Sequence, residues 1–183
     1  MTVAGLRLSH VANGVSAMYA TTARAMWQDI NDSAPILSIT NGVHRGTWQN
    51  PDIYRAYLSK GDLWSEHQKA KLRLFEEVRR QTALSLDPDV LTIGFARRAA
   101  PYKRSDLIFQ RPEVIEPLLN GGSLQIIFSG KAHPYDYAGK EIISTLVKYS
   151  KTHPGRVVFL ENYNIDIAKL MVQGVDVWLN NPK

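Results

Sequence analysis

The stretch Gly94-Phe95-Ala96-Arg97-Arg98-Ala99-Ala100-Pro101-Tyr102-Lys103-Arg104 places four cations directly after an apolar run. Residues 90–93 are Val-Leu-Thr-Ile, which is typical of a strand buried on both faces of a parallel sheet. Ser105 is a candidate N-cap for a following helix, at whose start Arg104 is expected to face away. We therefore predict a strand, a cationic loop (residues 97–104) and a helix.

The cationic loop has two interpretations. Clustered Arg and Lys are most often a solvated, charged face of a protein. However, ligands bind at the carboxyl ends of strands in open α/β sheets, and guanidinium groups near a helix N-terminus suit phosphate. Four like charges at such a junction repel each other unless an anion binds between them, which favours an anion site.

The composition is that of an ordinary globular protein. The 183 residues are 44% hydrophobic and 21% charged, with a net charge of +5 that lies largely in the cationic loop. The absence of cysteine excludes disulfides, thiolate metal sites and a cysteine nucleophile. No apolar run approaches the ~20 residues of a membrane span. We expect a cytoplasmic protein with no membrane or nucleic-acid partner.

Apolar residues at helical spacing predict two helices in the first half of the chain. The first covers about residues 11–27, with Met18 and Met26 on an apolar stripe that we expect to be exposed in this chain and covered in a full-length protein. The second covers about residues 65–86, with Leu72, Phe75 and Val78 on its apolar face.

Strands alternate with helices in the second half, which predicts an α/β fold with a parallel, Rossmann-like sheet. These strands are expected at residues 90–95, 124–128, 157–160 and 175–179, and one further strand is expected earlier in the chain, at residues 35–39. Polar loops follow four of them and should meet at one sheet edge, at residues 97–104, 130–133, 161–163 and 180–181. This convergence is the main indication of function in the residues themselves.

Several well-known site motifs are missing from the sequence. It has no Gly-x-Gly-x-x-Gly after a strand, no Walker loop, no nucleophile elbow and no His or carboxylate set with metal spacing. The chemistry would then depend on an anionic substrate or on a cofactor that is held elsewhere.

Six motifs, in one order along nearly the whole chain, resemble the α-glucan (glycogen or starch) phosphorylase family, in its shorter bacterial and archaeal type. They lie at residues 12–15, 39–48, 95–104, 129–134, 156–163 and 175–182. The family has the GT-B fold of two Rossmann-like domains. The resemblance implies a helical hinge region at residues 1–33, from the end of the N-terminal domain, and part of the C-terminal Rossmann-like domain at residues 34–183.

The resemblance also implies a reaction. These enzymes cleave terminal α-1,4-linked glucose with orthophosphate to give glucose 1-phosphate, and pyridoxal phosphate is their cofactor. The cofactor phosphate lies next to the substrate phosphate, and two adjacent phosphates require several cations. The implied partners are an α-1,4-glucan and orthophosphate, and a homo-oligomer of the full-length form is left open.

The matched positions assign roles to six polar residues. Arg98 and Lys103 match the ligands of the substrate phosphate. Asn13 and Tyr102 match contacts of glucose. Arg97 and Tyr163 match neighbours of the cofactor. Simpler interpretations are that Asn13 is a turn residue and Tyr163 a core aromatic. No metal ligand is predicted.

The family's cofactor lysine lies beyond the segment that ends this chain, and Lys183 is not in that motif. We expect an internal fragment that is inactive alone. The alternatives are a GT-B glycosyltransferase that uses a nucleotide sugar, similar to glycogen synthase, and a non-catalytic module that binds phosphate or polysaccharide.

Overall fold

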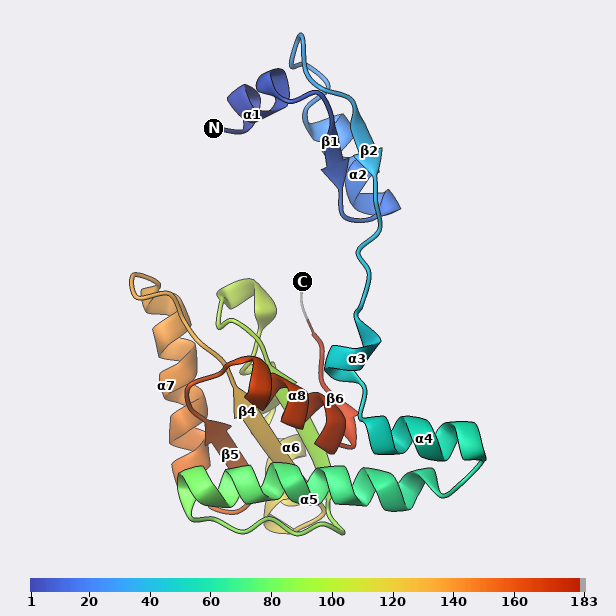
Figure 1. Cartoon of the computed structure of the whole chain (residues 1–183). Helices are drawn as coiled ribbons and strands as arrows, with labels where there is room; N and C mark the ends of the chain where they lie inside the picture. Colours follow the sequence, from blue (N-terminus) through green and yellow to red (C-terminus); the bar gives the residue numbers. More distant parts are fainter. Residues whose placement is uncertain (182–183) are drawn as a thin grey trace. The chain divides into compact units, whose positions relative to one another are not determined.

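The computed structural model describes residues 1–181, so the expectation for Lys183 lies outside the described residues. The chain divides into two compact units, Met1–His44 and Arg45–Lys183 (Figure 1). The predicted division at residues 33 and 34 concerns the domains of a longer enzyme and stays a prediction. No helix of the described residues is long and apolar enough to cross a bilayer.

The first unit is a small βαβ arrangement. After helix α1 (Thr2–Leu8) come strand β1 (Ala12–Gly14), helix α2 (Ala17–Met26) and strand β2 (Ile36–Ser38). The two strands are parallel, and β2 confirms the strand predicted at residues 35–39. The Ser16 side chain caps α2 by accepting a hydrogen bond from the N–H of Tyr19, at 3.1 Å.

The helix predicted over residues 11–27 is correct only in its second half, and its apolar stripe is exposed, as expected. Met18 and Met26 are exposed, whereas Ala20 is fully buried. The reason is the close approach of α2 to β1, because a Cβ added to Gly14 would lie 2.6 Å from the Cα of Ala20. Only small side chains fit there, so the larger apolar residues lie on the opposite side of the helix.

The second unit begins with three helices, α3 (Arg45–Trp48), α4 (Pro51–Ser59) and α5 (Leu63–Thr82). Helix α5 is shorter than predicted because Ala83 takes a left-handed conformation with φ of 58° and ends it. Phe75 and Val78 are buried as predicted, but Leu72 is 48% exposed.

A four-stranded parallel sheet forms the centre of the second unit. Its strands are β3 (Leu91–Ala96), β4 (Leu124–Ser129), β5 (Val157–Leu160) and β6 (Val177–Trp178), in the order β5-β4-β3-β6. The predicted α/β class with a parallel, Rossmann-like sheet, consistent with a GT-B domain, is confirmed.

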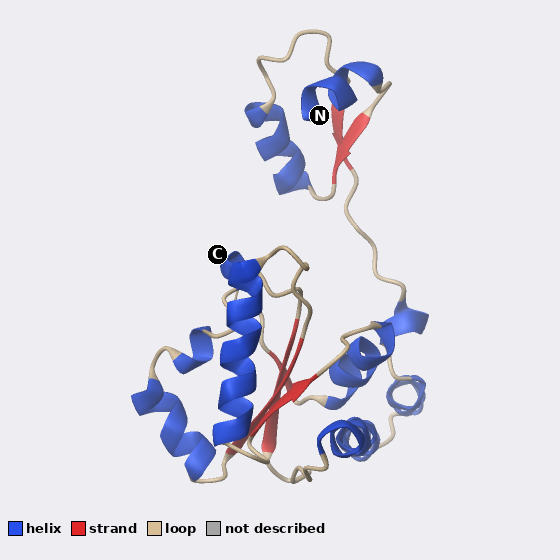
Figure 2. Ribbon diagram, turned by 90° about the vertical axis from the view of Figure 1, so that its left-hand side faces the viewer, coloured by secondary structure: helices blue, strands red, loops and turns tan. Residues whose placement is uncertain are grey.

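Helices cover both faces of this sheet (Figure 2). Helices α5 and α8 (Ile165–Gly174) cover one face, and the buried cluster there comprises Leu74, Phe75, Val78, Ala96, Ile127, Val158, Leu160, Ile167, Met171 and Val175. Helices α6 (Pro112–Asn120) and α7 (Tyr137–Thr152) cover the other face, with the cluster Phe95, Phe109, Ile115, Leu119, Leu124, Ile126, Phe128, Leu146 and Val157. Burial of these side chains stabilises the three layers.

The helix predicted from Ser105 was wrong. Two short 3-10 turns, η1 (Pro101–Lys103) and η2 (Leu107–Phe109), occupy this segment, and α6 begins only at Pro112. Proline is favoured at the first position of a helix because its missing N–H would be unpaired there. Pro112 is therefore the start of α6.

The strand order reverses between β3 and β6. The chain proceeds from β3 through α6 to β4 and through α7 to β5, and α8 then returns it to β6 on the other side of β3. In open α/β sheets this topological switch point, at the carboxyl ends of the strands, is where ligands bind.

Candidate anion-binding site

The cationic loop leaves β3 at the switch point and is held against the loop after β4. The Arg97 N–H donates to the carbonyl of Ser129 at 3.3 Å, and the Ala99 N–H donates to the carbonyl of Lys131 at 2.9 Å. Gly130 permits this contact, because an added Cβ would lie 2.3 Å from the Arg97 carbonyl oxygen. The backbone at the start of the cationic loop therefore continues the pairing of β3 with β4, and these hydrogen bonds fix its course.

Arg98, Tyr102 and Lys103 lie together on this loop. The Arg98 guanidinium and the Lys103 ammonium lie close to the Tyr102 hydroxyl, and these positive charges lower the pKa of Tyr102 below its ordinary value. The Nζ of Lys103 is 4.4 Å from the centroid of the Tyr102 ring, which is a cation–π distance. Because Arg98 and Tyr102 are exposed, this group of three side chains can meet an anion from solvent.

The other two cations bind the segment that follows β6. Arg97 donates a hydrogen bond from its guanidinium to the side-chain oxygen of Asn180. The Nε of Arg104 donates to the carbonyl of Asn181 at 2.9 Å, and the Nδ2 of Asn181 donates back to the Arg104 carbonyl at 3.1 Å. Arg104 thus does not face away at a helix start, as expected from the sequence, but connects two loops.

Two further predicted site residues, Tyr163 and Asn13, are not part of the cationic loop. Tyr163 follows β5 and packs against the cluster beneath α5 and α8, where burial raises the pKa of its hydroxyl. Asn13 belongs to the first unit and is an exposed strand residue of β1, opposite Leu37, rather than a turn residue. The roles of both at glucose or at a cofactor stay predictions.

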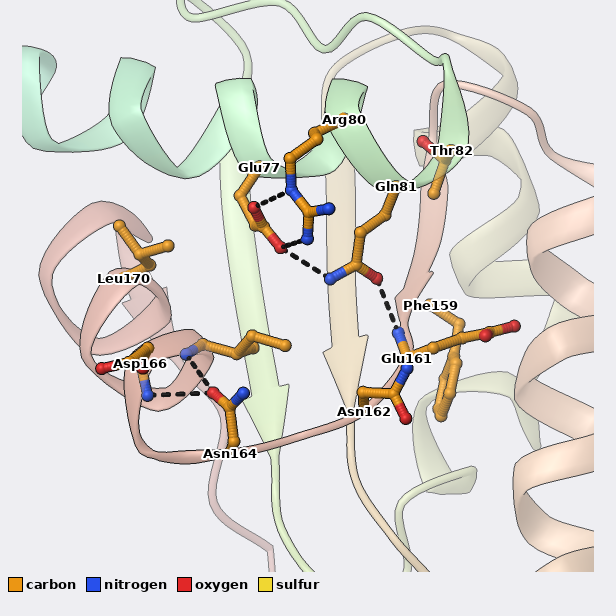
Figure 3. Close-up of a pocket in the computed structure, with 11 residues that line it drawn as sticks. Glu77, Arg80, Gln81, Thr82, Phe159, Glu161, Asn162, Asn164, Asp166 and Leu170 are labelled. Atoms are coloured by element: carbon orange, nitrogen blue, oxygen red, sulfur yellow. Dashed lines mark hydrogen bonds and ion pairs between the residues drawn. The ribbon is translucent and has the colours of Figure 1, made fainter.

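A cavity of about 610 Å³ lies between the end of α5, the loop after β5 and the start of α8 (Figure 3). Its polar groups bind one another. Arg80 donates two hydrogen bonds of 2.7 Å to Glu77. The Gln81 side chain donates to Glu77 at 2.7 Å and accepts from the N–H of Glu161 at 3.0 Å. The lining carboxylates, Asp166 included, outnumber the one guanidinium. This cavity does not suit phosphate.

A buried polar cluster lies at the amino end of β3. The Nζ of Lys71 is 2.7 Å from Asp176, which also accepts from the Thr92 N–H at 2.8 Å and lies 2.8 Å from Nε2 of His67. Lys71 is charged, yet the residue is only 1% exposed. The cluster fixes the start of β6, the strand that leads to Asn180.

The donors of the cationic loop are guanidinium, ammonium and phenol groups, which suit the oxygens of phosphate. Within residues 1–181, no three His or acidic side chains are arranged to hold a metal ion. The loop is therefore a candidate oxyanion site at the switch point, and Arg98 is its exposed cation.

No family model matches the chain. It is 36% identical to the glycogen phosphorylase of Aquifex aeolicus, in a match that covers 99% of this chain and 33% of the relative. The maltodextrin phosphorylase of Thermococcus litoralis is 33% identical over 100% of this chain and 27% of its own length. The glycogen synthase of Rhodopseudomonas palustris is 27% identical over 80% of this chain and 27% of its own length. The chain thus spans a third or less of the length of these relatives.

Proposed function

Over nearly its whole length this chain is a sequence relative of the glycogen and maltodextrin phosphorylases, and we propose that it supplies the phosphate-binding part of an α-glucan phosphorylase. The proposed reaction is cleavage of terminal α-1,4-linked glucose by orthophosphate, which yields glucose 1-phosphate. The observation that carries the proposal is the grouping of Arg98 and Lys103 around Tyr102 at the switch point of the sheet.

Arg98 and Lys103 have different tasks in this proposal. The planar guanidinium of Arg98 can bind two phosphate oxygens at once, whereas the ammonium of Lys103 acts as a point charge. Together they hold the attacking phosphate and offset its charge as the glycosidic bond breaks. Tyr102 and, from the first unit, Asn13 are the proposed contacts of glucose.

The same loop suits a second phosphate group, that of pyridoxal phosphate. Arg97, whose guanidinium is oriented by Asn180, and Tyr163 are the residues that we propose to hold the cofactor. When bound, the cofactor supplies a phosphate group that exchanges a proton with the substrate phosphate. The task of this chain is to keep two mutually repelling anions close together, which requires the several cations of the loop.

A titration of the chain with orthophosphate tests the proposal. Backbone and arginine side-chain NMR signals are followed at constant ionic strength, and we expect shifts at residues 97–104 and 180–181. Hydrogen bonds to a charged group contribute about 1.5–3 kcal/mol, so Arg98→Ala and Lys103→Ala should each weaken binding roughly tenfold to a hundredfold.

The control for this titration is Arg111→Ala, which removes an exposed arginine paired with Glu113 outside the loop. It should bind orthophosphate as the wild type does. Equal losses in all three variants would mean that net charge, and not a built site, attracts the anion.

A second candidate is a glucosyltransferase that uses a nucleotide sugar, favoured by the match to the Rhodopseudomonas palustris glycogen synthase. The diphosphate of such a donor would bind the same cations. Titration with ADP-glucose separates the two candidates, because tighter binding of ADP-glucose than of orthophosphate would favour the transferase. A non-catalytic binding module would bind orthophosphate or ADP-glucose without turnover.

The cytoplasmic location of the protein stays a prediction.

A further inference from the structure

The segment after β6 provides neutral partners for two of the four cations in the cationic loop. Asn180 accepts a hydrogen bond from Arg97, and Asn181 exchanges two hydrogen bonds with Arg104. The Arg104–Asn181 pair joins residues 77 positions apart in the chain. It connects the cationic loop to the segment after β6, and the hydrogen bonds of Arg97 and Ala99 connect the same loop to the segment after β4.

The exchange with Asn181 holds Arg104 in an uncommon conformation. Arg104 is the C-cap of η1 and has a φ of 49°, in the left-handed region that non-glycine residues seldom adopt. The Asn181 amide binds the carbonyl of this residue, and the Arg104 side chain binds the backbone of Asn181. Since η1 contains Tyr102 and Lys103, fixing its end fixes the direction of both side chains.

The choice of amides over carboxylates in this segment has an electrostatic reason. An amide oxygen can orient a guanidinium without adding a negative charge, whereas an Asp at either position would compete with an incoming anion. In addition, Asn181 Oδ1 is buried and has no hydrogen-bond partner within the described residues.

We propose that Asn180 and Asn181 are positioning residues of the phosphate site. They hold Arg97 and Arg104 at its two sides, so that Arg98, Tyr102 and Lys103 face the anion. This inference rests on the proposed phosphate-binding function. It adds that the affinity for phosphate depends on how the cations are oriented as well as on how many there are. The segment after β6 sets this orientation.

The test compares variants that leave the net charge unchanged. Asn181→Ala removes the amide that binds the Arg104 carbonyl, and Arg104→Lys keeps the charge but removes the guanidinium Nε. Each variant loses about one hydrogen bond between the two loops. We therefore expect each to bind orthophosphate roughly three- to tenfold more weakly than the wild type. The matched control is Asn120→Ala at the end of α6, an exposed asparagine that should bind as the wild type does.

A second measurement follows the phenol of Tyr102 by ¹³C NMR. If the pair positions η1, the pKa of Tyr102 should rise toward its ordinary value in Asn181→Ala, because Arg98 and Lys103 move away from the hydroxyl. A structural role remote from the loop would leave this pKa unchanged. Unchanged signals of Ile126 and Val158 show that the sheet is intact, and Arg104→Lys serves if Asn181→Ala does not fold.

The outcomes separate this inference from the proposed function. If Asn181→Ala and Arg104→Lys bind orthophosphate as the wild type does while Arg98→Ala does not, the positioning role is wrong and the phosphate site stands. If the wild type does not bind orthophosphate, the proposed function fails. If the pKa of Tyr102 is also unchanged in Asn181→Ala, the proposed positioning of η1 by Asn181 is rejected.

Discussion

At the amino end of β6, the carboxylate of Asp176 receives hydrogen bonds from two other elements. Burial alone would raise its pKa, but the hydrogen bonds from Lys71, from His67 and from the Thr92 N–H outweigh burial and lower the pKa of Asp176 below its ordinary value. A carboxyl whose pKa is lowered by folding stabilises the protein above its unfolded pKa. That contribution is lost as the pH falls through the folded pKa.

We predict that Asp176→Asn lowers the free energy of unfolding by about 3 kcal/mol at neutral pH, because Lys71 is left buried without a counter-charge. The variant should also lose less stability than the wild type as the pH falls below the ordinary pKa of aspartate. Urea denaturation at a series of pH values measures both effects.

The control is Asp89→Asn, a change of an exposed aspartate next to β3, which should alter stability by less than about 0.5 kcal/mol. Wild-type stability of Asp176→Asn at neutral pH would show that the Lys71–Asp176 pair contributes no net stabilisation.

At the scale of single elements, α5 shows what hydrophobic periodicity can and cannot predict. The helix and two of its core residues, Phe75 and Val78, follow from spacing alone. Leu72, also predicted for the core, is exposed, and the buried residue is Lys71, which shares the helical stripe of Phe75 and Val78 by its positions i, i+4 and i+7. The partner that makes its burial favourable, Asp176, is 105 residues away, and no local pattern reveals it.

The cationic loop gives the same lesson for the candidate site. Its position after a buried strand, and hence the grouping of Arg98 with Lys103, was predictable from charge and hydrophobic pattern. The 3-10 turns in place of a helix were not, because they depend on Arg104 adopting a left-handed conformation against Asn181. Contacts between loops from different strands decide such details.

Contact between the loops after β3 and β4 leads to a prediction for Gly130→Ala. The new Cβ would lie 2.3 Å from the Arg97 carbonyl, so the two loops must separate. We expect a loss of about 1–3 kcal/mol in the free energy of unfolding, as for other overpacked contacts, together with weaker binding of orthophosphate. Urea denaturation and the phosphate titration measure the two effects.

Gly42→Ala is the matched control for this change, because nothing lies within 4 Å of its added Cβ. It should retain wild-type stability and phosphate binding. Retention of both by Gly130→Ala would mean that the loops after β3 and β4 do not approach as closely as the structure shows.

At the scale of the whole chain, the parallel sheet of the second unit was predictable and the βαβ packing of the first unit was not. Alternating apolar and amphipathic segments predict the order of strands and helices, and the topology then brings their loops to one edge. The first unit is difficult to predict because its core is made of small residues. Its buried apolar side chains are Leu6, Ala20, Ala23 and Ala34.

This difference in core size predicts unequal stability along the chain. Alanine buries little apolar surface, so local opening of the first unit should cost less free energy than opening of the sheet in the second unit. The amides of Ile39 and Ile126 allow a fair comparison, because they donate strand-type hydrogen bonds of 2.9 Å and 2.7 Å, respectively. In native-state hydrogen exchange we expect Ile39 to be less protected by about a hundredfold or more, which corresponds to about 2.7 kcal/mol. Equal protection of the two amides would instead show that both units unfold in one cooperative step, with the small core of the first unit stabilised as strongly as the sheet.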